Sequence, residues 1–173
     1  LHDIPNTVAA AVTSLAQLPV GLLTVHATGG PAMMAAAAQA RKKAGSDLKL
    51  LAVTVLTSMD SSELASVGFD ETPAALVDRL AHLAVEAGVD GLVCSPVELG
   101  EVRAICGPQM AIVTPGVRPR GAETDDQARF LTPAEAVARG ADYLVVGRPI
   151  LRAAEPAAAA RAILGEMREA EQA

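Results

Sequence analysis

The apolar run at 143–147 ends in Gly147 and is followed by Arg148, and these two residue types together fit a definite chemistry. Glycine lets backbone N–H groups come close to an anion, and an arginine guanidinium offers a fork of donors to phosphate oxygens. The segment LVVGRPI therefore predicts a phosphate site at the end of a strand. An ordinary strand-to-helix turn with a surface arginine is the alternative that spacing alone leaves open.

A second segment, VTPGVRP, turns the chain after another apolar run and presents Arg118. The polar stretch that follows has Ala122 as its one apolar residue before Ala128, so no core of its own holds it in place. Such a composition is typical of a lid that closes over a charged substrate. Gln127, near the end of this stretch, could donate a hydrogen bond to a phosphate. A solvated loop is the alternative.

Two further sets of polar residues are candidates for binding. Thr57 and Ser58 follow the apolar run 48–56 and could contact a polar edge of a ligand, although hydroxyls after a strand are also common helix caps. Near the N-terminus, Asp3 stands before Ile4-Pro5 in the stretch LHDIPNT. A solvent-facing acid beside a helix cap is the alternative to a functional turn at this position.

A repeated pattern of strand and helix must position these polar residues. The apolar runs rich in Val and Leu lie at 20–26, 48–56, 91–95, 110–114 and 143–147. None alternates cleanly between apolar and polar residues, which is typical of strands covered on both faces in a parallel sheet. The Ala-rich segments between the runs carry helix-start signals at Asn6 or Thr7, Pro31, Thr72-Pro73, Thr132-Pro133 and Pro156. The first helix is expected to extend to about Leu18.

This alternation predicts an α/β fold with right-handed crossovers. A doubly wound open sheet and a (β/α)8 barrel both fit it, but no Gly-x-Gly-x-x-Gly follows a strand, which disfavours a dinucleotide-binding sheet. Polar residues collect after every strand, and a barrel carries its active site on the rim formed by these strand ends. Because a full barrel takes ~250 residues, we expect residues 1–173 to be the C-terminal portion of a single (β/α)8 TIM barrel domain, with about five strand–helix units.

Composition disfavours several classes of function. Aromatic residues make up 2% of the sequence and the formal net charge is −6, which argues against binding of nucleic acid or of an anionic membrane. No apolar run reaches membrane-spanning length and no signal peptide precedes LHDIPNT, so a cytoplasmic protein is expected. Cys94 and Cys106 are too few for a disulfide scaffold, and Cys94 is expected to be buried. His2 and His26 lack the paired spacing of metal ligands, so no metal is expected, and His26 is expected to be a packed or hydrogen-bonded core residue and not a catalyst.

In chain order, these segments resemble the orotidine 5′-phosphate decarboxylase family over essentially the whole sequence. The resemblance is carried by HDIPNT, VHATGG, AVTVLTSMD, GLVCS, VTPGVRP, DDQARF and YLVVGRPI. It implies a homodimer of (β/α)8 barrels that converts orotidine 5′-phosphate to UMP in pyrimidine synthesis, without a cofactor. Loss of CO2 leaves a carbanion on the pyrimidine ring, which in this family a lysine ammonium stabilises and protonates.

The resemblance also implies roles for individual residues. Thr57 matches the residue that reads the pyrimidine edge, and Pro115 with Gly116 matches the turn that packs beside the base. Arg118 matches a substrate-contacting arginine on the side of the lid. The residues that bind the phosphate in this family are matched by Gln127, Gly147 and Arg148.

The N-terminal stretch matches the end of a family motif, Asp-x-Lys-x-x-Asp-Ile-Pro-Asn-Thr. Asp3 matches its second aspartate and Thr7 its threonine, and both are expected to serve the active site of the neighbouring subunit. The catalytic lysine of the motif is therefore expected immediately before Leu1.

The lysines of this sequence are not expected to replace the lysine of the motif. Lys42 and Lys43 are placed at a helix end and Lys49 at the start of a strand, which is the wrong end of a barrel. We therefore expect residues 1–173 to be inactive alone. The alternatives left open are a non-catalytic barrel fragment, or a sugar-phosphate decarboxylase or hexulose-phosphate synthase of the same superfamily, most of which use a metal.

Overall fold

The computed structural model describes residues 1–119 and 131–171, and its strands form one parallel sheet. The strands β1 (Leu22–His26), β2 (Lys49–Val53), β3 (Gly91–Val93), β4 (Ala111–Pro115) and β5 (Tyr143–Val145) pair in sequence order, each parallel to the next. The α-helices are α1 (Pro5–Leu15), α2 (Pro31–Ala44), α3 (Ser61–Ser66), α4 (Pro73–Ala87), α5 (Leu99–Cys106), α6 (Pro133–Ala138), α7 (Arg148–Leu151) and α8 (Pro156–Glu171). Two short 3-10 helices, η1 (Ala27–Gly29) and η2 (Pro96–Glu98), follow β1 and β3.

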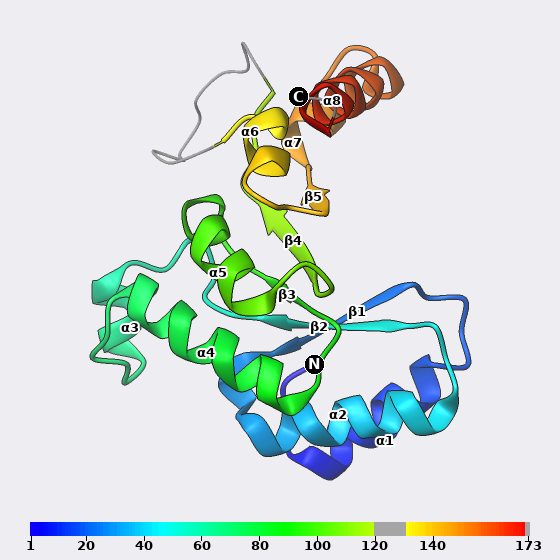
Figure 1. Cartoon of the computed structure of the whole chain (residues 1–173), viewed down its shortest axis with the longest axis vertical. Helices are drawn as coiled ribbons and strands as arrows, with labels where there is room; N and C mark the ends of the chain where they lie inside the picture. Colours follow the sequence, from blue (N-terminus) through cyan, green and yellow to red (C-terminus); the bar gives the residue numbers. More distant parts are fainter. Residues whose placement is uncertain (120–130, 172–173) are drawn as a thin grey trace.

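The order of the strands distinguishes a barrel from a doubly wound sheet. In a doubly wound sheet the order reverses at a switch point, whereas in a barrel each strand lies beside the next one in the sequence. Here the order β1-β2-β3-β4-β5 has no reversal. Figure 1 shows the chain passing from α1 and α2 at one end to α6, α7 and α8 at the other, with the sheet between them. The predicted α/β fold of the barrel type is confirmed.

The strands and most helix starts lie where the sequence predicted them. Proline opens α2, α4, α6 and α8, and the hydroxyls of Thr72 and Thr132 each accept a hydrogen bond from the third residue of their helix. The first helix corrects the prediction, because Ile4 is its N-cap and neither Asn6 nor Thr7 caps it. Pro5 occupies the first helical position, which suits its fixed φ and its missing N–H. This helix ends at Leu15, short of the expected Leu18.

Leu1 pairs with the outer edge of β1. Its amino group donates to Thr24 O at 2.7 Å, and His26 N donates to Leu1 O at 2.9 Å. Two hydrogen bonds that flank a residue in this way are the pattern of a parallel ladder. Asp3 therefore leaves the sheet at its carboxyl edge. His2 stacks on His26 with ring centroids 5.8 Å apart, so His26 is packed against a neighbouring ring, but it is half-buried and lies outside the core in which the sequence placed it.

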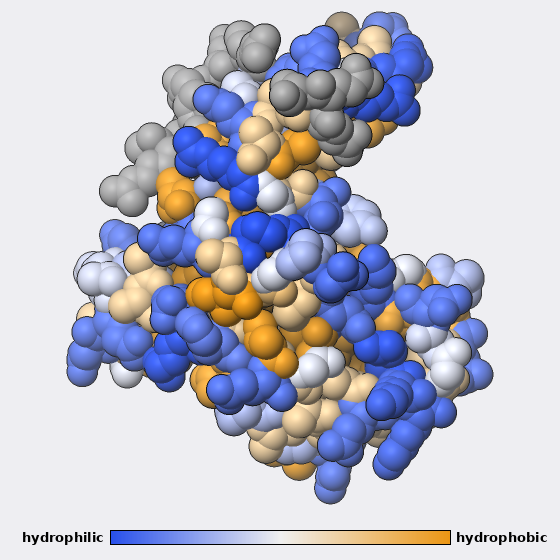
Figure 2. Space-filling model, viewed as in Figure 1, coloured by the Kyte–Doolittle hydropathy of each residue, from blue (hydrophilic) through white to orange (hydrophobic). Residues whose placement is uncertain are grey.

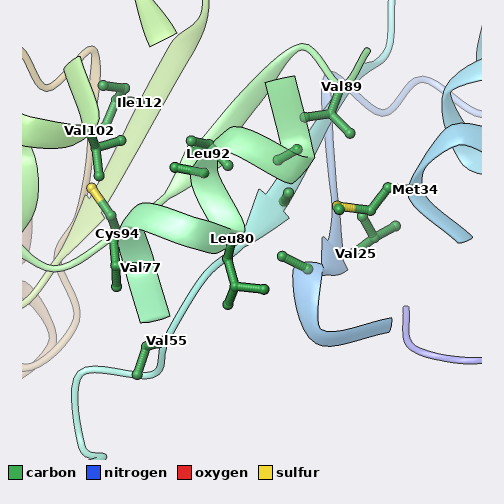
Figure 3. Packing of buried hydrophobic residues seen from close by; sticks show 14 of the residues in the cluster. Val25, Met34, Val55, Val77, Leu80, Val89, Leu92, Cys94, Val102 and Ile112 are labelled. Atoms are coloured by element: carbon green, nitrogen blue, oxygen red, sulfur yellow. The ribbon is translucent and has the colours of Figure 1, made fainter. Parts of the chain in front are cut away.

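The two faces of the sheet differ in how fully they are buried. On the face covered by helices, Leu50 is completely buried in the main apolar core, as are Leu92 and Ile112, which Figure 3 labels. On the opposite face, a second cluster holds Leu51, Ala111 and Val113. At the ends of the sheet Leu22, Tyr143 and Val145 are 37%, 40% and 53% exposed. Burial on both faces, which the apolar runs predicted, is thus found in the middle strands and not at β1 and β5.

Polar side chains dominate the surface in the view of Figure 2, and an apolar area lies near the middle of that face. Within residues 1–119 and 131–171, no helix combines the length and the apolar character needed to cross a membrane.

Two equivalent arginine–aspartate pairs brace the amino ends of the strands. Arg41 of α2 donates to Asp90, which also accepts from the N–H of Leu50 in β2 at 2.8 Å. Arg103 of α5 donates to Asp142 at 2.6 Å, and that carboxylate oxygen accepts from the N–H of Ile112 in β4 at 2.7 Å. Each aspartate directly precedes the next strand, so each pair ties a helix to two strands.

Candidate functional site

A cleft of about 630 Å³ lies at the carboxyl ends of the strands, the end at which barrels carry their active sites. Residues 55–61, which follow β2, and residues 95–98, which follow β3, line it together with Pro73, Gly116 and Arg148. A smaller pocket of about 200 Å³ shares residues 55–58 with this cleft and adds Cys94 and Pro115. The two pockets form the candidate site.

The turn after β2 places Thr57 and Ser58 in the wall of both pockets. The helix that follows, α3, is capped by Asp60, whose carboxylate accepts from the N–H groups of Ser62 and Glu63 at 2.8 and 2.9 Å. Thr57 and Ser58 are therefore not caps of this helix. The alternative that the sequence left open, in which their hydroxyls cap the helix after the strand, does not apply. Sequence reasoning did not predict α3.

Arg148 lines the cleft from the turn after β5. The preceding residue, Gly147, is the N-cap of the four-residue helix α7, and its carbonyl accepts from the N–H groups of Ile150 and Leu151 at 3.0 Å each. A Cβ built on Gly147 would meet no atom within 4 Å, so the space beside its backbone is open. The structure thus brings Thr57, Gly116 and Arg148 together from three different strand ends, with Pro115 in the adjoining pocket.

Other predicted site residues lie elsewhere. Arg118 is only 8% exposed and is not among the described residues that line the two pockets. Its backbone N–H donates to Leu131 O at 3.0 Å and its guanidinium donates to Val117 O at 3.1 Å. Gln127 and the predicted lid lie outside the described residues.

Asp3 and Thr7 are exposed and, in the part of the chain that the structure describes, do not line either pocket. A carboxylate oxygen of Asp3 accepts from the N–H of Ile4 at 2.7 Å.

Sequence reasoning missed Glu98, which lines the cleft although it is only 9% exposed. Burial raises the pKa of this carboxyl above its usual value, while hydrogen bonds from the Ser95 hydroxyl and from the backbone N–H groups of Glu98 and Ser95 act in the opposite direction. Its Oε2 atom is buried and has no hydrogen-bond partner among the described residues. The Ser-x-x-Glu spacing of SPVE was the available signal.

Cys94 is 1% exposed, as the sequence predicted, and lies in the apolar core near Val77 and Val102 (Figure 3). Burial raises the pKa of its thiol to about 12, and the nearby charge of Glu98 adds to this shift. The thiol is therefore protonated at neutral pH, so it packs as a small apolar group.

The lysines lie away from the candidate site. Lys42 and Lys43 occupy the last turn of α2. Lys49 begins β2 and lines a different cleft, of about 590 Å³, at the amino ends of the strands together with Arg103 and Asp142. Because these are the lysines of the whole sequence, no lysine of residues 1–173 lines the candidate site. The described residues also contain no group of three His, Cys, Asp or Glu side chains that could hold a metal ion.

Comparison with known proteins gives consistent matches. The model of the orotidine 5′-phosphate decarboxylase / HUMPS family matches residues 1–163. An orotidine 5′-phosphate decarboxylase from Opitutus terrae is 54% identical over 168 residues, which cover 97% of this chain and 73% of that protein. An orotidine 5′-phosphate decarboxylase from Anaeromyxobacter sp. is 57% identical over 163 residues, which cover 94% of this chain and 70% of that protein.

Solved structures agree with these matches. The crystal structure of orotidine 5′-phosphate decarboxylase from Lactobacillus acidophilus superposes with a TM-score of 0.83 at 38% identity, covering 96% of this chain and 72% of that chain. An uncharacterized conserved protein from Geobacillus kaustophilus superposes with a TM-score of 0.78 at 35% identity, covering 96% of this chain and 73% of that chain.

Proposed function

Because this chain belongs to the orotidine 5′-phosphate decarboxylase / HUMPS family, we propose that its protein converts orotidine 5′-phosphate to UMP and CO2 in pyrimidine synthesis, without a cofactor. The observation that carries the proposal is the grouping of Thr57, Gly116 and Arg148 in one cleft at the carboxyl ends of the strands. Its volume of about 630 Å³ is in the range of small-molecule sites.

Different residues of the cleft bind the two ends of the nucleotide, the phosphate and the base. Arg148 donates to the phosphate oxygens, and the open backbone at Gly147 lets the same anion come close. Thr57 reads the polar edge of the pyrimidine, and Pro115 with Gly116 packs beside the base. Binding energy from the phosphate, far from the reacting carbon, holds the ring in the orientation that the reaction needs.

The chemical step requires a cation beside the ring. The bond between the ring carbon and the carboxylate breaks, its electron pair stays on that carbon, and a proton added there completes UMP. A cation held in place before the reaction stabilises the developing carbanion. In the family motif that group is a lysine, whereas Lys42, Lys43 and Lys49 of this chain lie away from the cleft. We propose that residues 1–173 form the C-terminal part of a single barrel domain and do not turn over substrate alone.

The assembly belongs to the same proposal. Asp3 and Thr7 would act in the active site of the second subunit of a homodimer, where the carboxylate of Asp3 would hold the lysine charged and in place. Their exposure, and their absence from the described lining of the two pockets, support this role. The enzyme would be cytoplasmic.

Titration of UMP by calorimetry tests the nucleotide site. Arg148→Ala should weaken UMP binding about 10- to 100-fold, because a hydrogen bond to a charged group contributes ~1.5–3 kcal/mol. Binding of uridine, which has no phosphate, should not change. Arg152→Ala, four residues further on and exposed, is the matched control and should bind UMP like the unmodified chain. Equal UMP affinity in Arg148→Ala and the unmodified chain would contradict the assignment.

A decarboxylation assay tests the reaction. Residues 1–173 alone should release no CO2 from orotidine 5′-phosphate, and measurable turnover by a chain of verified mass would refute that expectation. For the complete protein, turnover of orotidine 5′-phosphate should be unaffected by a chelator. Turnover of a sugar phosphate that a chelator abolishes would instead support the metal-dependent relatives of the same superfamily.

A further inference from the structure

Two parts of the chain supply the residues of the candidate site. Thr57 and Gly116 follow β2 and β4, whereas Arg148 follows β5. The elements α6, β5, α7 and α8 form a C-terminal unit (residues 133–171), which lies at one end of the molecule, away from α1 and α2 (Figure 1). A nucleotide that contacts Arg148 with its phosphate and the other residues with its base therefore needs the two parts held in one fixed relation.

Apolar packing holds the C-terminal unit only weakly. In the described residues, α8 packs against α6 and α7, and these three helices have no comparable contact with α1 to α5. Of the unit's described residues, Ala136 and Ala141 are buried in the main core, and Leu144 and Val146 pack against it while partly exposed. Alanine buries little apolar area, so its contribution is small. The ladder between β4 and β5 spans three residue pairs.

Arg103 of α5 joins the unit to the rest of the fold at the amino ends of the strands. Its Nε and one terminal nitrogen donate to Gly140 O at 3.1 and 2.6 Å, and the same terminal nitrogen donates to Asp142 at 2.6 Å. The other terminal nitrogen donates to Gly107 O and Met110 O at 2.7 and 2.8 Å. A guanidinium has five N–H donors, so Arg103 uses all of them to tie the turn before β4 to the turn before β5.

The turn before β5 fits closely around this side chain. Gly140 has a φ of +101°, and a Cβ built on it would lie 3.0 Å from both Cγ and Nε of Arg103. The equivalent arginine, Arg41, is bound less completely. It donates to Asp90, but its Nε is buried without a partner among the described residues. Full use of the guanidinium is therefore particular to the arginine that holds the C-terminal unit.

We propose that Arg103 is a positioning residue for nucleotide binding, because it fixes the C-terminal unit against β4 and so sets the place of Arg148 relative to the residues that contact the base. This inference rests on the proposed function, in which one nucleotide contacts both parts. Arg103 lines the cleft at the amino ends of the strands, so it acts without touching the nucleotide. A site that adopts its binding arrangement for only part of the time binds more weakly in the same proportion.

Arg103→Lys tests this role. Lysine keeps the charge that pairs with Asp142, but it has three donors on a flexible stem in place of five donors in a fixed plane. By calorimetry the variant should bind UMP about three- to tenfold more weakly, an effect the size of one net hydrogen bond. Binding of uridine and of inorganic phosphate should not change, because each contacts only one of the two parts. Arg41→Lys makes the same change in the equivalent pair and should leave all three affinities unchanged.

A double-mutant cycle shows whether Arg103 acts through Arg148. Adding Arg103→Lys to Arg148→Ala should cause no further loss of UMP affinity, because the contact that Arg103 positions is already gone. Thermal unfolding of each variant reports whether it is folded.

Gly140→Ala disturbs the same link from the other side and should show the same selective loss for UMP. Gly88→Ala is its control, because Gly88 also has a positive φ, of +76°, but a Cβ there would meet no atom within 4 Å. The two variants share the backbone strain, and only the first displaces Arg103.

Several outcomes would overturn the inference. These are unchanged UMP affinity in Arg103→Lys, equal losses for UMP, uridine and inorganic phosphate, or losses that multiply with Arg148→Ala. If Arg103→Lys does not fold, Gly140→Ala decides: a selective loss of UMP affinity supports the positioning role and an unchanged affinity refutes it. If the unmodified chain does not bind UMP, the proposed function fails together with the inference. Weaker UMP binding in Arg148→Ala with unchanged binding in Arg103→Lys refutes the inference alone.

Discussion

At the scale of the residue, burial and local hydrogen bonding act on the carboxyl of Glu98 in opposite directions. Its hydrogen bonds with Ser95 favour the charged form, and its burial disfavours it. Burial is the larger effect, so the pKa of Glu98 lies above its usual value. A carboxyl with a raised pKa weakens the folded state at neutral pH, because its charged form is less favourable there than in the unfolded chain.

The pH dependence of stability follows from the direction of this shift. Because the pKa of Glu98 is higher in the folded than in the unfolded chain, the folded chain binds this proton more tightly. Its contribution to the free energy of unfolding therefore falls as the pH rises through the unfolded pKa towards the folded one. Glu98→Gln removes this titration, so the variant should gain stability relative to the unmodified chain between about pH 4 and about pH 7. Urea unfolding at both pH values measures the difference.

Glu63→Gln is the control for that measurement, since Glu63 is an exposed capping glutamate. A stability difference between Glu98→Gln and the unmodified chain that stays constant over this pH range would show that Glu98 has an ordinary pKa.

At the scale of the element, close contact between strands limits which substitutions the sheet can accept. Gly91 opens β3 between β2 and β4, and a Cβ built on it would lie 2.2 Å from the carbonyl oxygen of Ala111. The same atom would lie 2.7 Å from a side-chain carbon of Leu51. The first neighbour is backbone held in a strand, which cannot move without disturbing the ladder.

Gly91→Ala is therefore expected to lower the free energy of unfolding by about 3 kcal/mol, at the upper end of typical costs for overpacking. Gly165→Ala is the matched control, because Gly165 lies within α8 and a Cβ there would meet no atom within 4 Å. That change should raise stability by about 0.5–1 kcal/mol, the usual gain from replacing glycine by alanine in a helix. Urea denaturation compares the two, and equal stability of Gly91→Ala and the unmodified chain would contradict the packing argument.

At the scale of the whole molecule, the sheet has an apolar face that is only partly covered. Leu22 at one end and Tyr143 and Val145 at the other are exposed, whereas the cluster around Leu51 and Val113 fills the middle. Apolar surface of this kind at the ends of a sheet favours association with other chains.

Residues 1–173 are therefore expected to self-associate as their concentration rises, which sedimentation velocity measures. Val145→Thr keeps the β-branched shape of an exposed strand residue and should weaken association about fourfold, because a lost apolar contact of one methyl group costs ~0.8 kcal/mol. Leu164→Gln, at an exposed position on α8, is the control and should leave association unchanged. A monomer at every concentration would rule out a role for this face in association.

Much of the fold could be read from local signals. Each apolar run became a strand, and Thr72 and Thr132 capped the helices that they were expected to cap. These signals act over a few residues, so they can be recognised without knowledge of the rest of the chain. The short helices α3 and α5 were missed, although Asp60 with Glu63 forms a capping box before α3. The first helix was misjudged because Pro5 suits the first helical position even without a side-chain cap before it.

The sequence by itself determined the order of strands and helices, the resemblance to a family, and the candidate residues at the strand ends. Tertiary structure alone decided which of those residues meet, because Thr57 and Arg148 come together only through the parallel pairing of β2 to β5. It also decided that Arg118 is buried away from the described cleft and that Glu98 is buried within its wall. Burial depends on neighbours distant in the chain, and no pattern of nearby residues specifies them.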